Sequence, residues 1–231
     1  SCQCIHACLI YRHHFCLCTI FFNSLFYAAV SCTLLILICA PAAYALSRFD
    51  FVCNKLIQSS LVASMGVPVV MIVLPLFAVV AGLNILNNVS ANRATLIFLY
   101  IGINVPYTTI FLTTFFANLS RAFEEAAAID GCGIYGCFFR IALPLCRTGF
   151  FVSGLMTFIN NWNELLLAMV FISDPMKKTL PVTLTYFVGP YATNYVQMFA
   201  AIIIAIAPTV VVYSLFSNQI VEGLTTGAVK G

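Results

Sequence analysis

The chain has 231 residues, of which 62% are hydrophobic and only 7% are charged. A water-soluble globule of this size needs a polar surface that so few charged side chains cannot supply. The composition therefore places the chain in a lipid bilayer. The net charge of +3 is small and spread over several loops, so it favours neither nucleic acid nor a polybasic membrane patch as a partner.

The first 22 residues form an atypical leader rich in cysteine and histidine. The cysteines and histidines of the leader are Cys2, Cys4, His6, Cys8, His13, His14, Cys16 and Cys18. Arg12 and the histidines beside it interrupt the apolar stretch that a secretory signal needs. Thiols and imidazoles can bind soft metal ions, but their spacings here match no structural zinc site. We expect no metal and no cofactor, and we interpret residues 1–22 as an irregular leader or a damaged start of the gene product.

Five apolar segments follow, each long enough to cross the hydrocarbon core as a helix of about 20 residues. They cover residues 24–46, 56–83, 94–117, 149–172 and 196–216. None has the strict alternation of a porin strand, so we expect an all-α membrane bundle. Kinks are predicted at Pro68, Pro75, Pro106 and Pro208. No linker or repeat divides residues 23–231, which we expect to be one membrane domain.

The basic residues near the ends of these segments predict the orientation of the chain. One side would carry six of them: Arg48, Lys55, Arg121, Arg140, Arg147 and Lys230. The other side would carry Arg93, Lys177 and Lys178. Since cytoplasmic loops hold an excess of Lys and Arg, we expect the loop between the third and fourth spans and the C-terminus to be cytoplasmic.

That loop, residues 118–148, is the most polar part of the chain after the leader. Ser120 can cap a helix whose early turns carry Glu124 and Glu125, and acidic residues complement the dipole there. Three alanines favour the helix, and glycines at 131 and 133 predict its end.

A second, amphipathic helix should follow in the same loop. Its apolar stripe would be Ile134, Cys137, Phe138 and Ile141. Pro144 would close the unit before the next span. From composition alone, this helix pair could dock on a soluble partner or lie on lipid headgroups.

Polar residues inside the spans are candidates for a functional site, such as a polar path through the membrane, because burying them in lipid is costly. The principal group is Asn160, Asn161, Asn163 and Glu164, and a weaker one is Asn104, Tyr107, Thr108 and Thr109. Glu164 is the only acidic residue within the five segments. It could line the path or serve as a structural partner of a neighbouring helix, and the second role is the commoner one for such residues.

The loop also carries a motif with fixed spacing. Glu125-Ala126-Ala127 is followed after three residues by Gly131, and after nine more by Ile141-x-Leu143-Pro144. This pattern resembles the EAA loop of the membrane subunits of binding-protein-dependent ABC importers. Segments at 23–25, 41–49, 162–164, 178–182 and 223–231 resemble the carbohydrate branch of these permeases, which includes the smaller permease subunit of the maltose transporter.

The resemblance implies a permease subunit in the inner membrane of a bacterial-type cell. Its partners would be a second permease subunit, a dimer of cytoplasmic ATP-binding subunits and an extracytoplasmic solute-binding protein. The residues coupling it to the ATPase would be Glu124, Glu125, Ala126, Ala127, Gly131, Ile141, Leu143 and Pro144. The chain has no phosphate-binding Gly-x-x-x-x-Gly-Lys-Ser/Thr sequence, so we expect ATP hydrolysis in a separate subunit and no enzyme activity here.

The family normally has six spans, with one more helix before the segment that starts near Asn23. Only the leader stands there, and we expect either a truncated or frame-disrupted member or a leader that forms an unusually poor first span. The branch implies a sugar or oligosaccharide as solute. The alternatives are an ABC permease for another solute, or a secondary transporter or channel, which would need more charge inside the membrane.

Overall fold

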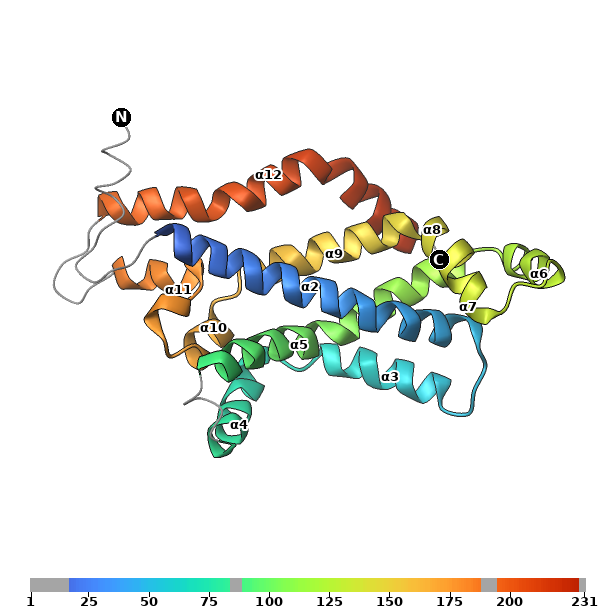
Figure 1. Ribbon diagram of the computed structural model, residues 1–231, viewed down its shortest axis with the longest axis horizontal. Coiled ribbons are helices and arrows are strands. Elements are labelled where there is room, and N and C mark those ends of the chain that lie inside the picture. The colour runs from blue at the N-terminus through green and yellow to red at the C-terminus, as the bar shows by residue number, and fades with distance from the viewer. Residues whose placement is uncertain (1–16, 84–88, 188–194, 229–231) are drawn as a thin grey trace. The chain divides into compact units, whose positions relative to one another are not determined.

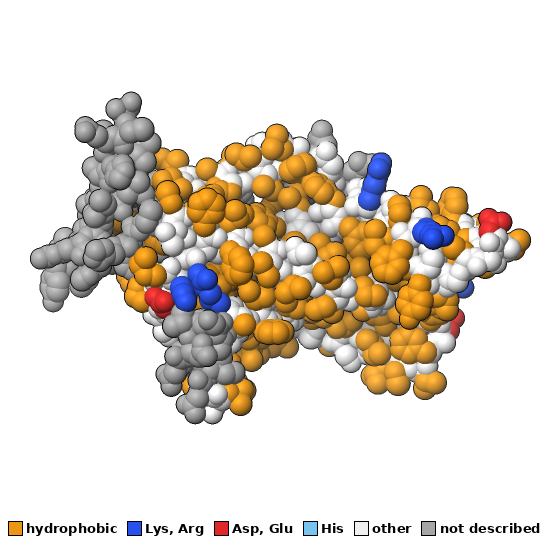
Figure 2. All heavy atoms as spheres, viewed as in Figure 1, with side chains coloured by type: hydrophobic (Ala, Val, Ile, Leu, Met, Phe, Trp, Pro, Cys, Tyr) orange, Lys and Arg blue, Asp and Glu red, His pale blue; other side chains and the backbone are white. Residues whose placement is uncertain are grey.

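The computed structural model describes residues 17–83, 89–187 and 195–228, and this part of the chain contains helices and no strand (Figure 1). Three of its helices are long and apolar enough to cross a membrane, and the number rises to five if each of two bent helix pairs counts as one span. The predicted all-α membrane architecture is confirmed. Hydrophobic side chains also dominate the face drawn in Figure 2.

The three continuous candidate spans are α2 (Leu17–Arg48), α5 (Val89–Asn118) and α12 (Tyr195–Ala228). Each contains one proline within its helix, which removes a backbone hydrogen bond. Because α2 begins at Leu17, residues 17–22 of the predicted leader are helical. The rest of the leader, with most of its cysteines and all its histidines, lies outside the described residues.

The second predicted span is a broken pair, α3 (Asn54–Met65) and α4 (Val69–Gly82), whose axes differ by 99°. The kink predicted at Pro68 is thus a full break. Gly66 ends α3, and Val67 precedes a proline, a position that disfavours the helical conformation. Pro75 lies within α4.

The fourth predicted span, residues 149–172, differs from the structure. Helix α9 covers Arg147–Trp162, and a separate short helix, α10, covers Leu166–Phe171. The carboxylate of Glu164 stabilises the start of α10, because it accepts the backbone N–H groups of Leu167 at 2.7 Å and of Ala168 at 3.1 Å. These are among the amides that a helix N-terminus leaves without partners.

The remaining elements are short. The loop between α5 and α9 holds α6 (Ala122–Ile129), α7 (Ile134–Cys137), the π-helical turn η2 (Phe138–Ala142) and α8 (Leu143–Leu145). After α10 come η3 (Pro175–Lys177), α11 (Leu180–Leu184) and η4 (Thr185–Phe187).

The chain forms two compact units. Unit 1 comprises Ser1–Ser31, Val69–Tyr100 and Phe158–Leu215. Its buried apolar cluster consists of Ile20, Ala28, Trp162, Leu180 and Ala205. The indole N–H of Trp162 donates to the carbonyl of Ala205 at 3.0 Å, so the large ring is buried with its polar group satisfied.

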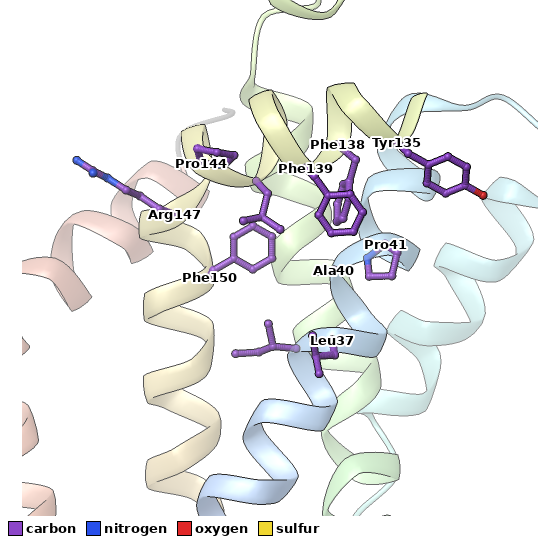
Figure 3. A pocket seen from close by; sticks show the side chains of 11 residues that line it. Leu37, Ala40, Pro41, Tyr135, Phe138, Phe139, Pro144, Arg147 and Phe150 are labelled. Carbon is purple, nitrogen blue, oxygen red and sulfur yellow. The ribbon is translucent and has the colours of Figure 1, made fainter. Parts of the chain in front are cut away.

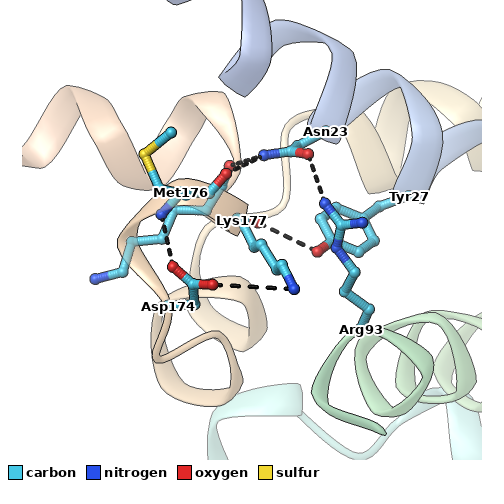
Figure 4. Close-up of polar contacts among 7 residues, drawn as sticks. Asn23, Tyr27, Arg93, Asp174, Met176 and Lys177 are labelled. Carbon is cyan, nitrogen blue, oxygen red and sulfur yellow. Dashed lines mark hydrogen bonds and ion pairs between the residues drawn. The ribbon is translucent and has the colours of Figure 1, made fainter. Parts of the chain in front are cut away.

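Polar contacts fasten the segment after α10 to α2 and α5 within unit 1 (Figure 4). The Asn23 amide donates to the carbonyl of Met176 at 2.8 Å and accepts from Arg93 at 2.9 Å. The Tyr27 hydroxyl donates to the carbonyl of Lys177 at 3.2 Å. Arg93, a basic residue placed on the extracytoplasmic side from the sequence, therefore bonds the Asn23 side chain that contacts this segment.

Unit 2 comprises Cys32–Pro68, Ile101–Thr157 and Phe216–Gly231. An aromatic cluster connects α2, α5 and η2 in this unit, because the Tyr44 ring lies 5.4 Å from Phe116 and 5.1 Å from Phe138, centroid to centroid. Unit 2 contains the whole polar loop and the last turns of α2. The local geometry of that loop is therefore set within a single unit.

Candidate functional site

Helix α6 forms the first half of the polar loop. The N-cap position of α6 is Arg121, without a side-chain cap bond, and not Ser120 as predicted. The Ser120 hydroxyl lies one residue earlier and accepts the N–H of Ala122 at 3.3 Å. Glu124 and Glu125 lie in the first turn, where they complement the positive end of the helix dipole. The eight residues of α6 include no basic side chain, so this helix presents only negative formal charge.

Gly131 makes the turn after α6, as the sequence predicted. Its φ is +80°, in the left-handed region that favours glycine. The N–H of Gly131 donates to the carbonyl of Ala128 at 3.1 Å, and that of Cys132 to the carbonyl of Ala127 at 2.8 Å. This pair of bonds is a Schellman motif, which satisfies carbonyls that the helix end would leave free.

A helical run from Ile134 to Leu145 forms the second half of the loop. Cys137 and Phe138 are buried and Ile141 is half-buried, as the predicted stripe requires, but Ile134 is 60% exposed. Pro144 does not close the unit. It lies in the first turn of α8, where a missing N–H costs little, and the run ends at Cys146 before a 72° bend into α9.

An apolar cavity of about 450 Å³ lies between part of this second half and α2 (Figure 3). Leu37 and Pro41 of α2 line one side, and Phe138, Leu143 and Pro144 line the other. The Leu143-Pro144 part of the motif therefore faces α2 within unit 2. Arg147 reaches this region with its stem, and its charged end points away from the cavity in Figure 3.

Glu124 is held inside the unit. Its carboxylate accepts a hydrogen bond from the Arg48 Nε at 3.0 Å, and the two side chains are 16% and 5% exposed. Ala127, on the same side of α6, is buried. These two motif residues attach α6 to its own unit.

The opposite side of α6 is open. Ala122, Glu125, Ala126 and Ile129 are exposed, Ile129 to 87%. Their spacing of i, i+3, i+4 and i+7 places them on one helix face, which we call the outer face. Two residues of the outer face, Glu125 and Ala126, belong to the motif predicted from the sequence. Ala122 and Ile129 do not, although the helical spacing of small and apolar residues indicates that they share this face.

The residues predicted for the translocation path do not share one environment. Asn161 is buried and donates to the Ser31 hydroxyl at 2.9 Å. Glu164 accepts the Tyr100 hydroxyl at 3.0 Å in addition to the two amides of α10. Asn160 and Asn163 are exposed at the end of α9. The structure thus gives Asn161 and Glu164 contacts that support the scaffold of unit 1.

The weaker polar group in the third span is largely internal. Thr108 and Thr109 are buried in unit 2, and the Thr108 hydroxyl oxygen lies 3.5 Å from that of Thr157. Thr109 provides its backbone carbonyl to the hydroxyl of Thr113 at 2.7 Å. Such bonds to the helix backbone are common for threonine in membrane helices.

Cysteines in the described part of the chain are free thiols. Burial raises the pKa of Cys146, at the end of the polar loop, to about 11, so this thiol stays protonated and unreactive at neutral pH. Within the described ranges, no group of three or more His, Cys, Asp or Glu side chains could hold a metal ion.

Residues 32–224 match the family described as the inner membrane component of binding-protein-dependent transport systems. The chain belongs to this family. It is 39% identical over 210 residues to the sulfoquinovosyl glycerol transport system permease protein SmoH of Agrobacterium fabrum, covering 91% of this chain and 72% of SmoH. It is 31% identical to the diacetylchitobiose uptake system permease protein NgcG of Streptomyces coelicolor, covering 91% of this chain and 69% of NgcG.

A solved structure shares the fold. The crystal structure of a bacterial ABC transporter that imports the acidic polysaccharide alginate matches with a TM-score of 0.74 at 23% identity. The match covers 87% of this chain and 74% of that one. Family membership makes the chain a membrane-embedded transport component that works with a binding protein, and confirms the predicted ABC importer permease.

Proposed function

We propose that the chain is a permease subunit of a carbohydrate importer, and that the outer face of α6 docks in a groove of a cytoplasmic ATPase subunit. The exposure and composition of the outer face are the observations that support this docking. Ala122 and Ala126 let a partner approach the helix backbone closely, Ile129 supplies an exposed apolar anchor, and Glu125 adds one charge beside them.

The composition of α6 favours a protein groove over the membrane surface. Helices that lie on headgroups carry Lys and Arg on their polar face, because the cytoplasmic leaflet is negatively charged. Helix α6 carries Glu124 and Glu125 and no basic residue. Asp130 follows directly. Glu124 is paired with Arg48, and exposed Arg121 precedes α6, so the exposed charges at 121, 125 and 130 sum to −1. Anionic headgroups would not attract a segment of this charge, whereas a groove with basic side chains would bind it.

The remaining parts of the proposal rest on the family and on the charge pattern of the sequence. The loop and the C-terminus face the cytoplasm, in agreement with the excess of basic residues on that side. A second permease subunit completes the path, a pair of ATPase subunits drives it, and an extracytoplasmic binding protein delivers the solute. Asn160 and Asn163, exposed at the end of α9, would contact the solute, while Asn161 and Glu164 support the helices.

The relatives favour a carbohydrate as the solute. SmoH and NgcG are named for sulfoquinovosyl glycerol and diacetylchitobiose, which both contain sugar units. A thermal-shift assay of the partner binding protein against these two compounds, arabino-oligosaccharides and amino acids tests the class. Stabilisation by a carbohydrate supports the proposal, and stabilisation by an amino acid alone overturns it.

Co-purification tests the docking. The full complex, extracted in detergent through a tag on the permease, should yield the ATPase with the unaltered chain. Ala126→Trp should remove the ATPase while the permease remains in the membrane, because the indole blocks close approach at the outer face. Ala63→Trp is the matched control: Ala63 is an exposed alanine on α3 of the same unit. Undiminished ATPase with Ala126→Trp would contradict the assignment.

A further inference from the structure

The last turn of α2 is attached to the start of the polar loop through one arginine. One guanidinium, that of Arg48, makes two bonds: its Nε donates to Glu124 of α6 at 3.0 Å, and its Nη2 donates to the carbonyl of Leu119 at 2.8 Å. Leu119 lies just after α5. A single side chain at the end of a candidate membrane span therefore bonds both the residue after α5 and the first turn of α6.

The burial of these groups makes the contact specific. Arg48 and Glu124 are 5% and 16% exposed, so neither charge can be satisfied by water if the other is removed. The planar guanidinium can reach a carboxylate and a carbonyl at the same time, which an ammonium group on a flexible stem cannot reproduce with the same geometry. Glu125, the next residue, remains exposed on the outer face.

The same turn of α2 also contacts the second half of the loop. Tyr44 lies one helical turn before Arg48, and its ring packs against Phe138 of η2 and Phe116 of α5. Arg48 thus holds the first half of the loop, and Tyr44 holds the second. A displacement of the loop cannot occur without moving the end of α2 or breaking these contacts.

We propose that Arg48 is a positioning residue that transmits the movement of α6 to the membrane helix α2. This inference rests on the proposed docking of α6 on an ATPase. The ion pair carries a push or pull on α6 directly into the end of α2, while the outer face stays free for the partner.

A spin label at Ile38 tests the transmission. Ile38 is 53% exposed on α2 and is not among the residues that line the cavity beside the loop. It lies before Pro41 in the chain, so it reports movement that passes along the helix through the proline. In the complete complex in nanodiscs, a non-hydrolysable ATP analogue should change the spectrum of this label. Arg48→Gln and Glu124→Gln should retain the ATPase but reduce that change by roughly two- to thirtyfold.

Three further variants make the result specific. Lys55→Gln removes another basic residue from the same unit, on α3, and should respond like the unaltered chain. Arg48→Lys should give an intermediate response, because it keeps the charge but not the second bond. The exchange Arg48→Glu with Glu124→Arg should recover part of the response that either single change loses.

The outcomes separate this inference from the docking on which it rests. A full response in Arg48→Gln, with the ATPase bound, would overturn the inference and leave the docking intact. An equal loss in Lys55→Gln would also overturn it. Ala126→Trp serves as the check on docking: if that variant binds the ATPase and responds normally, the proposed function itself fails.

Discussion

Gly131 is the residue on which the shape of the polar loop depends most. With φ at +80°, any other L-residue is strained there, so Gly131→Ala should lower the free energy of unfolding by about 1–2 kcal/mol. Gly133→Ala is the matched control, because Gly133 has φ of −74° and open space where a Cβ would lie. Denaturant unfolding of the two purified variants measures the difference. Equal stability of the two would contradict the left-handed conformation of Gly131.

Glu164 illustrates how a charged residue in a predicted span can be structural. Its carboxylate accepts from Tyr100 and from two amides of α10. Glu164→Gln replaces one acceptor oxygen with a donor, and we expect a loss of about 1–3 kcal/mol in stability. Asn163→Ala, at an exposed neighbour that bonds only to its own helix carbonyl at Ile159 among the described contacts, should change stability by less than about 0.5 kcal/mol.

Thermal unfolding of the purified protein in detergent measures this pair of variants. If Glu164→Gln is as stable as the unaltered chain but transports less solute, then Glu164 lines the path instead of supporting α10. The sequence marked Glu164 as a costly polar group inside a predicted span. It could not name the partners, because Tyr100 is 64 residues away in the chain.

At the scale of elements, local signals predicted α6 and its turn well. Ser120, the first-turn acids, the alanines and Gly131 all act within a few residues of one another, so their effect is visible in the sequence. The π-turn and the position of Pro144 were not predictable in this way, because they depend on how the second half packs against α2. The inward direction of Glu124 likewise depends on Arg48, 76 residues away.

Helix α2 allows a direct test of orientation. At 32 residues it is about 48 Å long, enough to cross a hydrocarbon core of about 30 Å. Cys18 lies in its first turn and Cys53 follows its last turn by a few residues, and both are exposed. In single-cysteine variants, a membrane-impermeant maleimide should label Cys18 on intact cells and Cys53 only in inside-out vesicles.

Cys146 is the control for this labelling. It is buried, and its pKa is raised to about 11, so it should react slowly from either side. Labelling of Cys53 on intact cells would indicate the reverse orientation, with the polar loop outside the cytoplasm.

At the scale of the whole molecule, composition predicted the membrane, since 62% of the residues are hydrophobic. The length of the apolar segments and their lack of strict alternation predicted the helical class. The motif predicted the family, which the match over residues 32–224 confirms. The breaks in the second and fourth predicted spans were harder to foresee, because hydropathy averages over a window and does not register a short interruption such as the one after Trp162. The division of the chain into two units that each combine distant segments is equally a property of packing.

The central claim is that the outer face of α6 contacts an ATPase and not lipid. A photo-crosslinking amino acid at Ile129, which is 87% exposed, measures this in the assembled complex within its membrane. We predict an adduct with the ATPase subunit from position 129 and none from Leu56, an exposed position on α3 of the same unit. Lipid adducts alone from position 129, in membranes where the ATPase is bound, would contradict the account.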